Sequence, residues 1–232
     1  MLPVDPVAEL ALAASIWFLI HVGIAGSPLR RALSTRLGER GFQGAFSLLS
    51  LGVLVWLCLV YGRAPCEPLW ATPRALYYLP LAVMPLAFVL LAGAFAVPNP
   101  TVVGSEAALE SARAARGVLR ITRHPFLVAV ALWSAVHLII NGNLASLLFF
   151  GSMLLTAVFG TRDIDRKRLR HSPEAFVRYA GVTSVVPFLA IARGKNRLVW
   201  RELVVPLAIG AVLTVLVLVF HEQLFHVSAV PR

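Results

Sequence analysis

The sequence predicts an all-α protein: a polytopic bundle of six transmembrane helices that forms a single membrane domain over residues 1–232. Three observations predict this class. The 232-residue chain is 59% hydrophobic and 14% charged, with a mean hydropathy of +0.81, which lies outside the range of ordinary soluble domains. Six apolar runs are long enough to cross a bilayer. Lys and Arg are concentrated in alternate loops, as in multi-span membrane proteins.

The six apolar runs have the length that an α-helix needs to cross a hydrocarbon core of roughly 30 Å. In chain order they are 7–28, 41–61, 77–97, 124–141, 143–161 and 203–222. The polar turn Asn141-Gly142-Asn143 separates the fourth run from the fifth and predicts antiparallel neighbours. The first run is predicted to be a membrane span and not a cleaved signal peptide, because Asp5 and Glu9 stand where such a peptide is basic.

The net charge of +10 follows the predicted topology. Loops 29–40, 98–123 and 162–202 contain four, four and ten Lys and Arg residues, eighteen in all. The opposite side has only Arg63, Arg74 and Arg232. This asymmetry places the three basic loops in the cytoplasm and both termini outside. The partner that it predicts for these loops is the anionic surface of the lipid bilayer and not a nucleic acid.

Two cytoplasmic segments are predicted to form amphipathic helices along the membrane surface, near 105–117 and 163–181. The first has Ser105 as a candidate N-cap and ends at Gly117. The second has Ser172 as a cap, directly followed by a proline at the first helical position. Apolar side chains on one side of each segment would contact lipid.

A short motif occurs twice. The run IWFLIHVGIAG at 16–26 matches LWSAVHLIING at 132–142, so that Trp17 and His21 correspond to Trp133 and His137. Because the copies are on the first and fourth spans, they lie on helices of opposite direction, as in a 3+3 inverted repeat. Chance similarity between apolar helices explains the match equally well.

Histidines inside a membrane usually face the protein interior and have a partner. His21 is expected roughly 10 Å from the cytoplasmic end of its span, and His137 roughly 6 Å from the outer end. Trp133, His137 and Asn141 share one helix face, as do Trp17 and His21. A hydrogen bond to a neighbouring helix would satisfy each imidazole. Alternatively, two imidazoles on different helices can hold a haem iron from both sides.

The tripeptide Arg123-His124-Pro125 begins the fourth span at the cytoplasmic interface. It suits a proline-started helix with interfacial anchors, or a site for a carboxylate or phosphate group. Cys58 and Cys66 also leave two alternatives open, a disulfide or a buried free Cys58.

The chain resembles the NnrU family of bacterial membrane proteins. The resemblance rests on RITRHPFLVAVALWSAVHLIINGNLASLLFFGSMLLTAVFGTRDIDRKR, which begins at Arg120, and on HVGIAGSPLRRALSTRLGERGFQGAFSLLSL, which begins at His21. That family is grouped with zeta-carotene isomerase, a haem b protein that isomerises a cis double bond in a polyene. The resemblance implies a bacterial inner-membrane protein with periplasmic termini. It also implies either a haem-dependent isomerase of a hydrophobic small molecule, as in carotenoid biosynthesis, or an accessory factor of nitrite and nitric oxide metabolism, that is, denitrification.

The resemblance implies roles for individual residues. His21 and His137 would be the axial ligands of the haem iron and the catalytic pair. His124 would support the reaction, and Arg123 with His124 would hold the propionates. The residues around the cofactor would include Trp17, Trp133 and Asn141. Ser134 departs from the isomerases, where a cysteine precedes the second histidine by three residues, and this puts redox-gated ligand exchange in doubt.

A second similarity points to another class of enzyme. Arg123-His124-Pro125 followed by AFVRYAGVTSVVPF at 175–188 is similar to membrane methyltransferases of the isoprenylcysteine carboxyl methyltransferase type. Those enzymes bind S-adenosylmethionine at the cytoplasmic face. The acidic pair expected before the final helix is replaced here by the mainly basic segment DRKRLRHSPEAF, in which Glu174 is the acidic residue nearer to that helix.

Overall fold

A computed structural model describes residues 5–25, 27–111 and 113–230, and these are helical with short connections. The α-helices are α1 (Pro6–Leu19), α2 (Pro28–Tyr61), α3 (Leu79–Ala96), α4 (Pro125–Asn141), α5 (Leu144–His171), α6 (Pro173–Val182), α7 (Leu189–Ala192) and α8 (Trp200–Phe225). The shorter turns are one π-helix, η1 (Ile20–Ala25), and three 3-10 helices, η2 (Arg74–Tyr78), η3 (Glu106–Glu110) and η4 (Gly117–Arg120).

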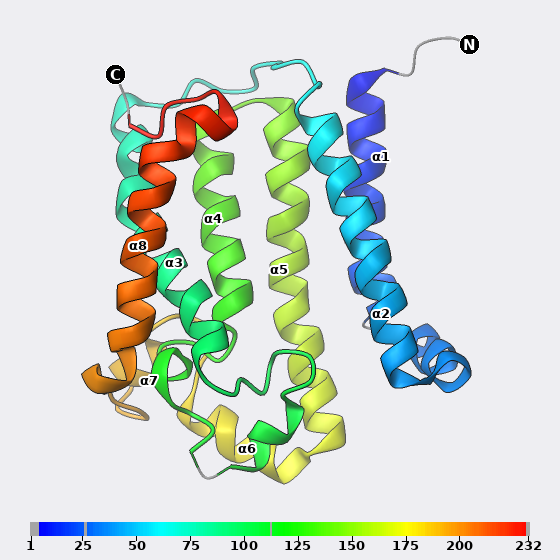
Figure 1. The fold of residues 1–232 in the computed structure, drawn as a ribbon, viewed down its shortest axis with the longest axis vertical. Coiled ribbons are helices and arrows are strands. Elements are labelled where there is room, and N and C mark those ends of the chain that lie inside the picture. The colour runs from blue at the N-terminus through cyan, green and yellow to red at the C-terminus, as the bar shows by residue number, and fades with distance from the viewer. Residues whose placement is uncertain (1–4, 26, 112, 231–232) are drawn as a thin grey trace.

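The long helices form one elongated bundle with α5 near its middle (Figure 1). On one side of α5 lie α1 and α2, and on the other lie α4, α3 and α8. The start of α1 and the end of α8 are at the same end of the bundle, here called the terminal end. The opposite end has α6, α7 and the basic segments 98–124 and 162–199, and is here called the basic end.

The predicted class and number of spans are confirmed. Five helices are long and apolar enough to cross a membrane, and the shorter apolar helix α4 supplies the sixth span. The chief boundary difference is in α5, which continues ten residues beyond the predicted end of its span, to His171. Within α2, Gly38 has φ +71° and breaks the helix, so the membrane-crossing part begins after it.

The turn between α4 and α5 is held by the loop that follows α2. Gly142 has φ +57°, and its carbonyl accepts hydrogen bonds from the backbone N–H groups of Leu69 and Trp70 at 2.8 and 3.1 Å. A Cβ atom on Gly142 would lie 2.5 Å from the carbonyl oxygen of Trp70. Only glycine therefore fits this turn without a shift of the loop.

Close backbone contact joins α3 to α8. A Cβ atom on Gly210 would lie 2.6 Å from the Val89 side chain and 2.9 Å from its backbone. Small residues at such crossings let membrane helices approach and gain dispersion energy, because lipid offers no hydrophobic driving force between helices.

The amphipathic segments at the basic end differ from the prediction. In place of one helix over 105–117 the chain forms the short turn η3, an irregular stretch over 113–116, and η4, which begins at Gly117. The helix is not formed because tertiary contacts outweigh its propensity: Leu109 and Ala114 are buried against Phe176 and Tyr179 of α6. The apolar side of α6 thus packs on the protein instead of the membrane surface. The predicted 163–181 helix is likewise divided at Ser172, between α5 and α6.

Both cysteines are free and exposed. The alternatives of a disulfide and of a buried Cys58 are therefore both wrong. Cys58 lies on the apolar helix α2, so its exposed thiol faces lipid, while Cys66 lies in the loop at the terminal end.

Candidate functional site

The two membrane histidines are held in the same way. The Nδ1–H group of His21 donates to the carbonyl oxygen of Trp17 at 2.8 Å, and that of His137 donates to Trp133 at 2.8 Å. No other hydrogen bond of these rings is present among the described residues, so Nε2 of each keeps its lone pair. A backbone partner on one nitrogen is the arrangement that orients a metal-ligating imidazole.

His137 lies in an aromatic cluster at the terminal half of the bundle. Its ring is stacked on Phe150 at 5.1 Å, and Trp133 lies edge-on to Phe150 at 5.1 Å. Ser134 is fully buried, and its hydroxyl has no partner among the described atoms. Asn141, by contrast, is exposed and donates to the His137 carbonyl at 2.8 Å, which closes the helix end.

His21 lies in the π-helical turn η1 on the other side of α5. Its ring lies 4.1 Å from that of Trp17 and 5.5 Å from that of Phe46 on α2. The Trp17 indole nitrogen is buried without a hydrogen-bond partner. The sequence prediction that each Trp-x-x-x-His pair shares a face agrees with these contacts.

The structure does not bring His21 and His137 together. Phe18 lies 5.6 Å from Phe159, whereas His137 lies beside Phe150, nine residues nearer the start of α5. His21 is a further three residues along the chain, in η1. At the helical rise per residue, the two imidazoles are offset along the bundle axis by about 18 Å.

This offset decides whether the pair fits one haem. Axial ligation requires two imidazoles on opposite faces of one porphyrin, only a few ångströms apart. Residues His21 and His137 do not fit that role in this arrangement. Opposite helix direction is the physical reason, because each histidine lies near the C-terminal end of its span and the two spans end on opposite sides of the membrane.

A third histidine lies in the terminal half of the bundle. His221 is near the end of α8, and its Nδ1–H donates to the Val227 carbonyl at 2.7 Å. Its Nε2 therefore keeps its lone pair, as does Nε2 of His137. Over the described residues, no group of three or more His, Cys, Asp or Glu side chains is arranged to hold a bare metal ion.

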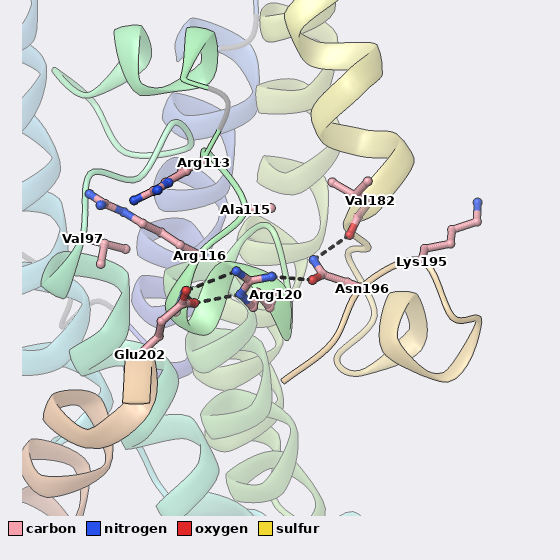
Figure 2. Close-up of a pocket in the computed structure, with 10 residues that line it drawn as sticks. Val97, Arg113, Ala115, Arg116, Arg120, Val182, Lys195, Asn196 and Glu202 are labelled. Atoms are coloured by element: carbon pink, nitrogen blue, oxygen red, sulfur yellow. Dashed lines mark hydrogen bonds and ion pairs between the residues drawn. The ribbon is translucent and has the colours of Figure 1, made fainter. Parts of the chain in front are cut away.

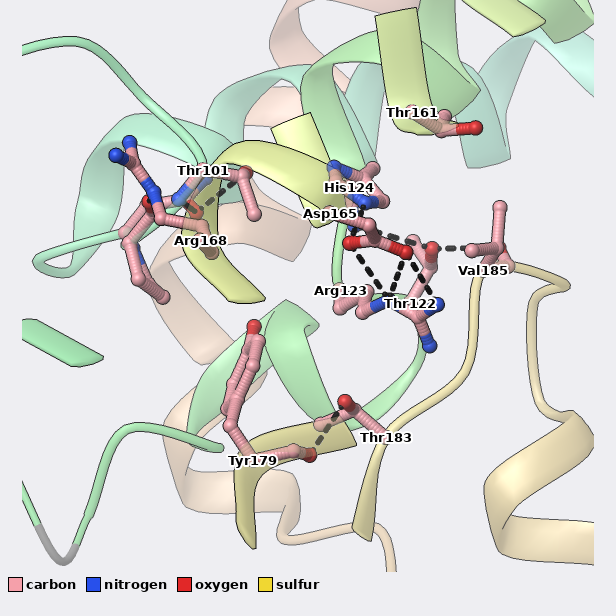
Figure 3. Close-up of polar contacts among 12 residues, drawn as sticks. Thr101, Thr122, Arg123, His124, Thr161, Asp165, Arg168, Tyr179, Thr183 and Val185 are labelled. Carbon is pink, nitrogen blue, oxygen red and sulfur yellow. Dashed lines mark hydrogen bonds and ion pairs between the residues drawn. The ribbon is translucent and has the colours of Figure 1, made fainter. Parts of the chain in front are cut away.

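The RHP element forms a second polar site, at the basic end (Figure 3). Asp165 on α5 accepts from Arg123 Nε at 3.1 and 3.0 Å through its two oxygens, and from His124 Nε2 at 2.8 Å. We call Arg123, His124, Asp165 and Tyr179 the RHD cluster. The Tyr179 hydroxyl points toward this group and is buried without a partner among the described residues.

His124 is fully buried and lies just before α4. Burial lowers the pKa of His124 below its ordinary value, with the Asp165 carboxylate acting in the opposite direction. The imidazole is therefore neutral near pH 7, and the acceptor-only carboxylate assigns the proton to Nε2. Its Nδ1 is left as a buried lone pair with no partner among the described residues.

These contacts change the predicted role of Arg123. The guanidinium donates to Asp165 through Nε and Nη2, so these two groups are not available to bind a propionate or another cofactor carboxylate. The cluster joins the start of α4 to α5 and to residues 184–188, where Arg123 N–H donates to the Ser184 carbonyl at 2.8 Å. Burial raises the pKa of Tyr179, so this phenol remains a hydrogen-bond donor.

Sequence reasoning missed Asp165. It lies 41 residues after His124, in a segment DIDRKR whose charges looked like a solvated face. The available signal was its spacing from Asp163: on a helix, two carboxylates two residues apart point to different sides, and one of them must face inward.

Comparison with known proteins agrees with this architecture. The family model described as NnrU protein matches residues 9–229. The chain is 27% identical over 198 residues to the chloroplastic 15-cis-zeta-carotene isomerase of Arabidopsis thaliana, covering 83% of this chain and 52% of that protein. It is 35% identical over 82 residues to the enzyme of the same name from Zea mays, covering 35% of this chain and 22% of that protein.

The chain thus spans about half, or less, of the length of these two curated relatives. No solved structure matches it. The family match extends from α1 to the end of the described chain, across all six spans. The protein therefore belongs to the NnrU protein family.

Proposed function

We propose that this protein is an intramembrane cis–trans isomerase of an extended polyene. The observation that carries the proposal is the similarity to 15-cis-zeta-carotene isomerase along 83% of the chain, which includes most of the membrane bundle. Since the identity is 27%, the substrate is proposed as a class, a long apolar polyene, and not as one compound.

The surface of the bundle supports a lipid-soluble substrate. Large apolar side chains are exposed along the outer helices, for example Leu51 and Val55 on α2 and Val212 and Val219 on α8. In a bilayer these faces contact acyl chains, so a polyene dissolved in the membrane reaches the protein without entering water.

Haem b is part of the proposal, with His137 as one axial ligand. The support is the free Nε2 of a half-buried imidazole whose Nδ1–H is fixed by Trp133. When bound, haem would supply an iron centre able to interact with an alkene. His221 is proposed as the opposite ligand because it lies in the same half of the bundle, near the end of α8, whereas His21 is offset from His137 by about 18 Å along the bundle axis.

The activity is tested in a bacterial host that accumulates 15-cis-zeta-carotene. Expression of the protein should convert the pigment to the 15-trans isomer, as measured by chromatography of the extracted carotenoids. Unchanged isomer ratios, with protein present in the membrane and haem supplied, would contradict the proposed reaction.

Haem is tested separately by absorbance of the purified protein. A Soret band is expected in the wild type and should be lost in His137→Ala. The band should also be lost in His221→Ala and kept in His21→Ala, and His226→Ala is the matched control because His226 lies past the end of α8. A colourless wild-type protein, purified from cells with ample haem, would contradict the proposal that haem b is the cofactor.

The location proposed is a bacterial inner membrane with both termini on the periplasmic side. The common position of the α1 start and the α8 end, away from the basic segments, supports it through the positive-inside tendency.

A further inference from the structure

A cavity of about 540 Å³ lies at the basic end, apart from the membrane histidines and the RHD cluster. It is bounded by the end of α3, by residues 113–120 and by the start of α8 (Figure 2). Its charged and amide lining is Arg113, Arg116, Arg120, Lys195, Asn196 and Glu202.

The carboxylate of this cavity is fully engaged. Glu202 accepts from Arg120 Nε at 2.8 Å and Nη2 at 3.1 Å, and from the backbone N–H of Gly117 at 2.6 Å. Arg120 also donates to the Asn196 amide oxygen at 2.8 Å. Arg120 and Glu202 thus neutralise each other and build one wall of the cavity (Figure 2).

Two further cations line one side of the cavity. Neither the Arg113 nor the Arg116 side chain has an ion pair or hydrogen bond within the described part of the chain, although the Glu202 carboxylate acts on Arg116 electrostatically. Lys195 lines the other side, and Figure 2 shows its amino group pointing away from the two arginines. Figure 2 shows the Arg113 and Arg116 guanidinium groups extending to the same side of the cavity, above Val97. Like charges gathered around one hollow favour an anion that bridges them.

The cavity lies at the level of the membrane interface. Two membrane-crossing helices end or begin at it: Val97 directly follows α3, and Glu202 is in the first turn of α8. Beside it, Phe95 is 64% exposed and Trp200 is 68% exposed. Exposed aromatic residues at helix ends mark the headgroup region, and apolar faces continue from them into the hydrocarbon.

We propose that this cavity binds the phosphate of an anionic phospholipid headgroup, with Arg113 and Arg116 contacting the phosphate and the acyl chains lying along the exposed faces of α3 and α8. Basic pockets between membrane helices on the cytoplasmic side recognise headgroups in this way. The site is independent of the proposed isomerase reaction, because none of its residues belongs to the aromatic cluster or the RHD cluster.

The test is native mass spectrometry of the full chain released from mixed micelles with phosphatidylglycerol or phosphatidylcholine. The wild type should retain phosphatidylglycerol preferentially. The double variant Arg113→Gln, Arg116→Gln should lower its affinity roughly tenfold, whereas Lys195→Gln should leave it nearly unchanged. The control Arg170→Gln, Arg178→Gln removes the same charge from exposed positions elsewhere at the basic end and should bind as the wild type does.

Competition with free inorganic phosphate distinguishes a site for a lipid headgroup from a site for phosphate alone. Added at the same concentration as the lipid, it should not displace phosphatidylglycerol, because the acyl chains contribute to binding. Displacement, or equal loss of lipid in both double variants, would overturn the proposal. Thermal midpoints of the variants are measured in parallel, and a variant that unfolds is replaced by Arg113→Gln alone, whose side chain is exposed.

Discussion

Asp165 is the residue on which the most polar contacts of the basic end converge. Its carboxylate faces a guanidinium and a neutral imidazole, and its side chain is 18% exposed. Removing one partner of a mostly buried pair leaves the other without compensation, which costs more than the intact pair contributes.

Asp165→Asn is therefore expected to lower the free energy of unfolding by about 2–3 kcal/mol. The control is Asp163→Asn on the same helix, whose partner Arg166 is 3.5 Å away and 69% exposed, so its loss should be hardly measurable. Thermal unfolding in detergent measures both. Equal effects of the two variants would show that the RHD cluster contributes no more than a surface ion pair.

His124 predicts a pH dependence. Its pKa in the folded protein lies below the ordinary value of 6.5, so below pH 6.5 the unfolded chain binds more protons than the folded chain. The stabilising contribution is complete above that pH and is lost as the pH falls through the lowered folded pKa. The thermal midpoint should fall on acidification, and His124→Asn, which does not titrate, should flatten this slope. An identical slope in the variant would contradict the assignment of a neutral buried imidazole.

Which residues carry polar chemistry was only partly predictable from the sequence. His21, His124 and His137 stand out because ionisable residues are rare in apolar runs, and the faces they share with Trp17 and Trp133 follow from helical spacing. The partner of His124 did not follow, because a contact across 41 residues depends on how two helices pack. The separation of His21 from His137 depends on depth in the bundle, which the motif match alone does not express.

At the scale of elements, the apolar runs predicted the spans well because bilayer thickness fixes helix length. The basic loops were predicted poorly. Propensity and caps indicated a helix at 105–117, but Glu106 pairs with Arg168 at 3.3 Å, and Arg168 Nε donates to the Pro100 carbonyl at 2.7 Å. These long-range contacts fix the segment in an irregular path that local signals do not contain.

The crossing of α3 and α8 yields a prediction about packing. Gly210→Ala places a methyl group against the Val89 backbone, so the two helices must separate, at an expected cost of about 1–3 kcal/mol. The control is Gly52→Ala on α2, where a Cβ atom meets nothing within 4 Å. Unfolding midpoints in detergent should fall for the first variant and stay nearly constant for the second. No difference between them would show that the α3–α8 crossing tolerates separation.

At the scale of the whole molecule, the common end of α1 and α8 predicts how the protein is labelled in cells. Cys66 is exposed in the loop at the terminal end, and Cys58 faces lipid on α2. A membrane-impermeant maleimide is added to cells whose outer membrane is permeabilised and whose inner membrane is intact. It should label the wild type once and Cys66→Ser not at all. Labelling that appears only after the inner membrane is broken would place the terminal end in the cytoplasm.

The length of α4 has a consequence for the depth of His137. Its 17 residues span about 25 Å, less than the roughly 30 Å hydrocarbon thickness of a typical bilayer. Its neighbours α3 and α5 are longer, so they extend past it in the bundle. His137 lies four residues before the last residue of α4, which is about 6 Å along the helix axis. This imidazole is therefore closer to the membrane interface at the terminal end than to the middle of the bilayer.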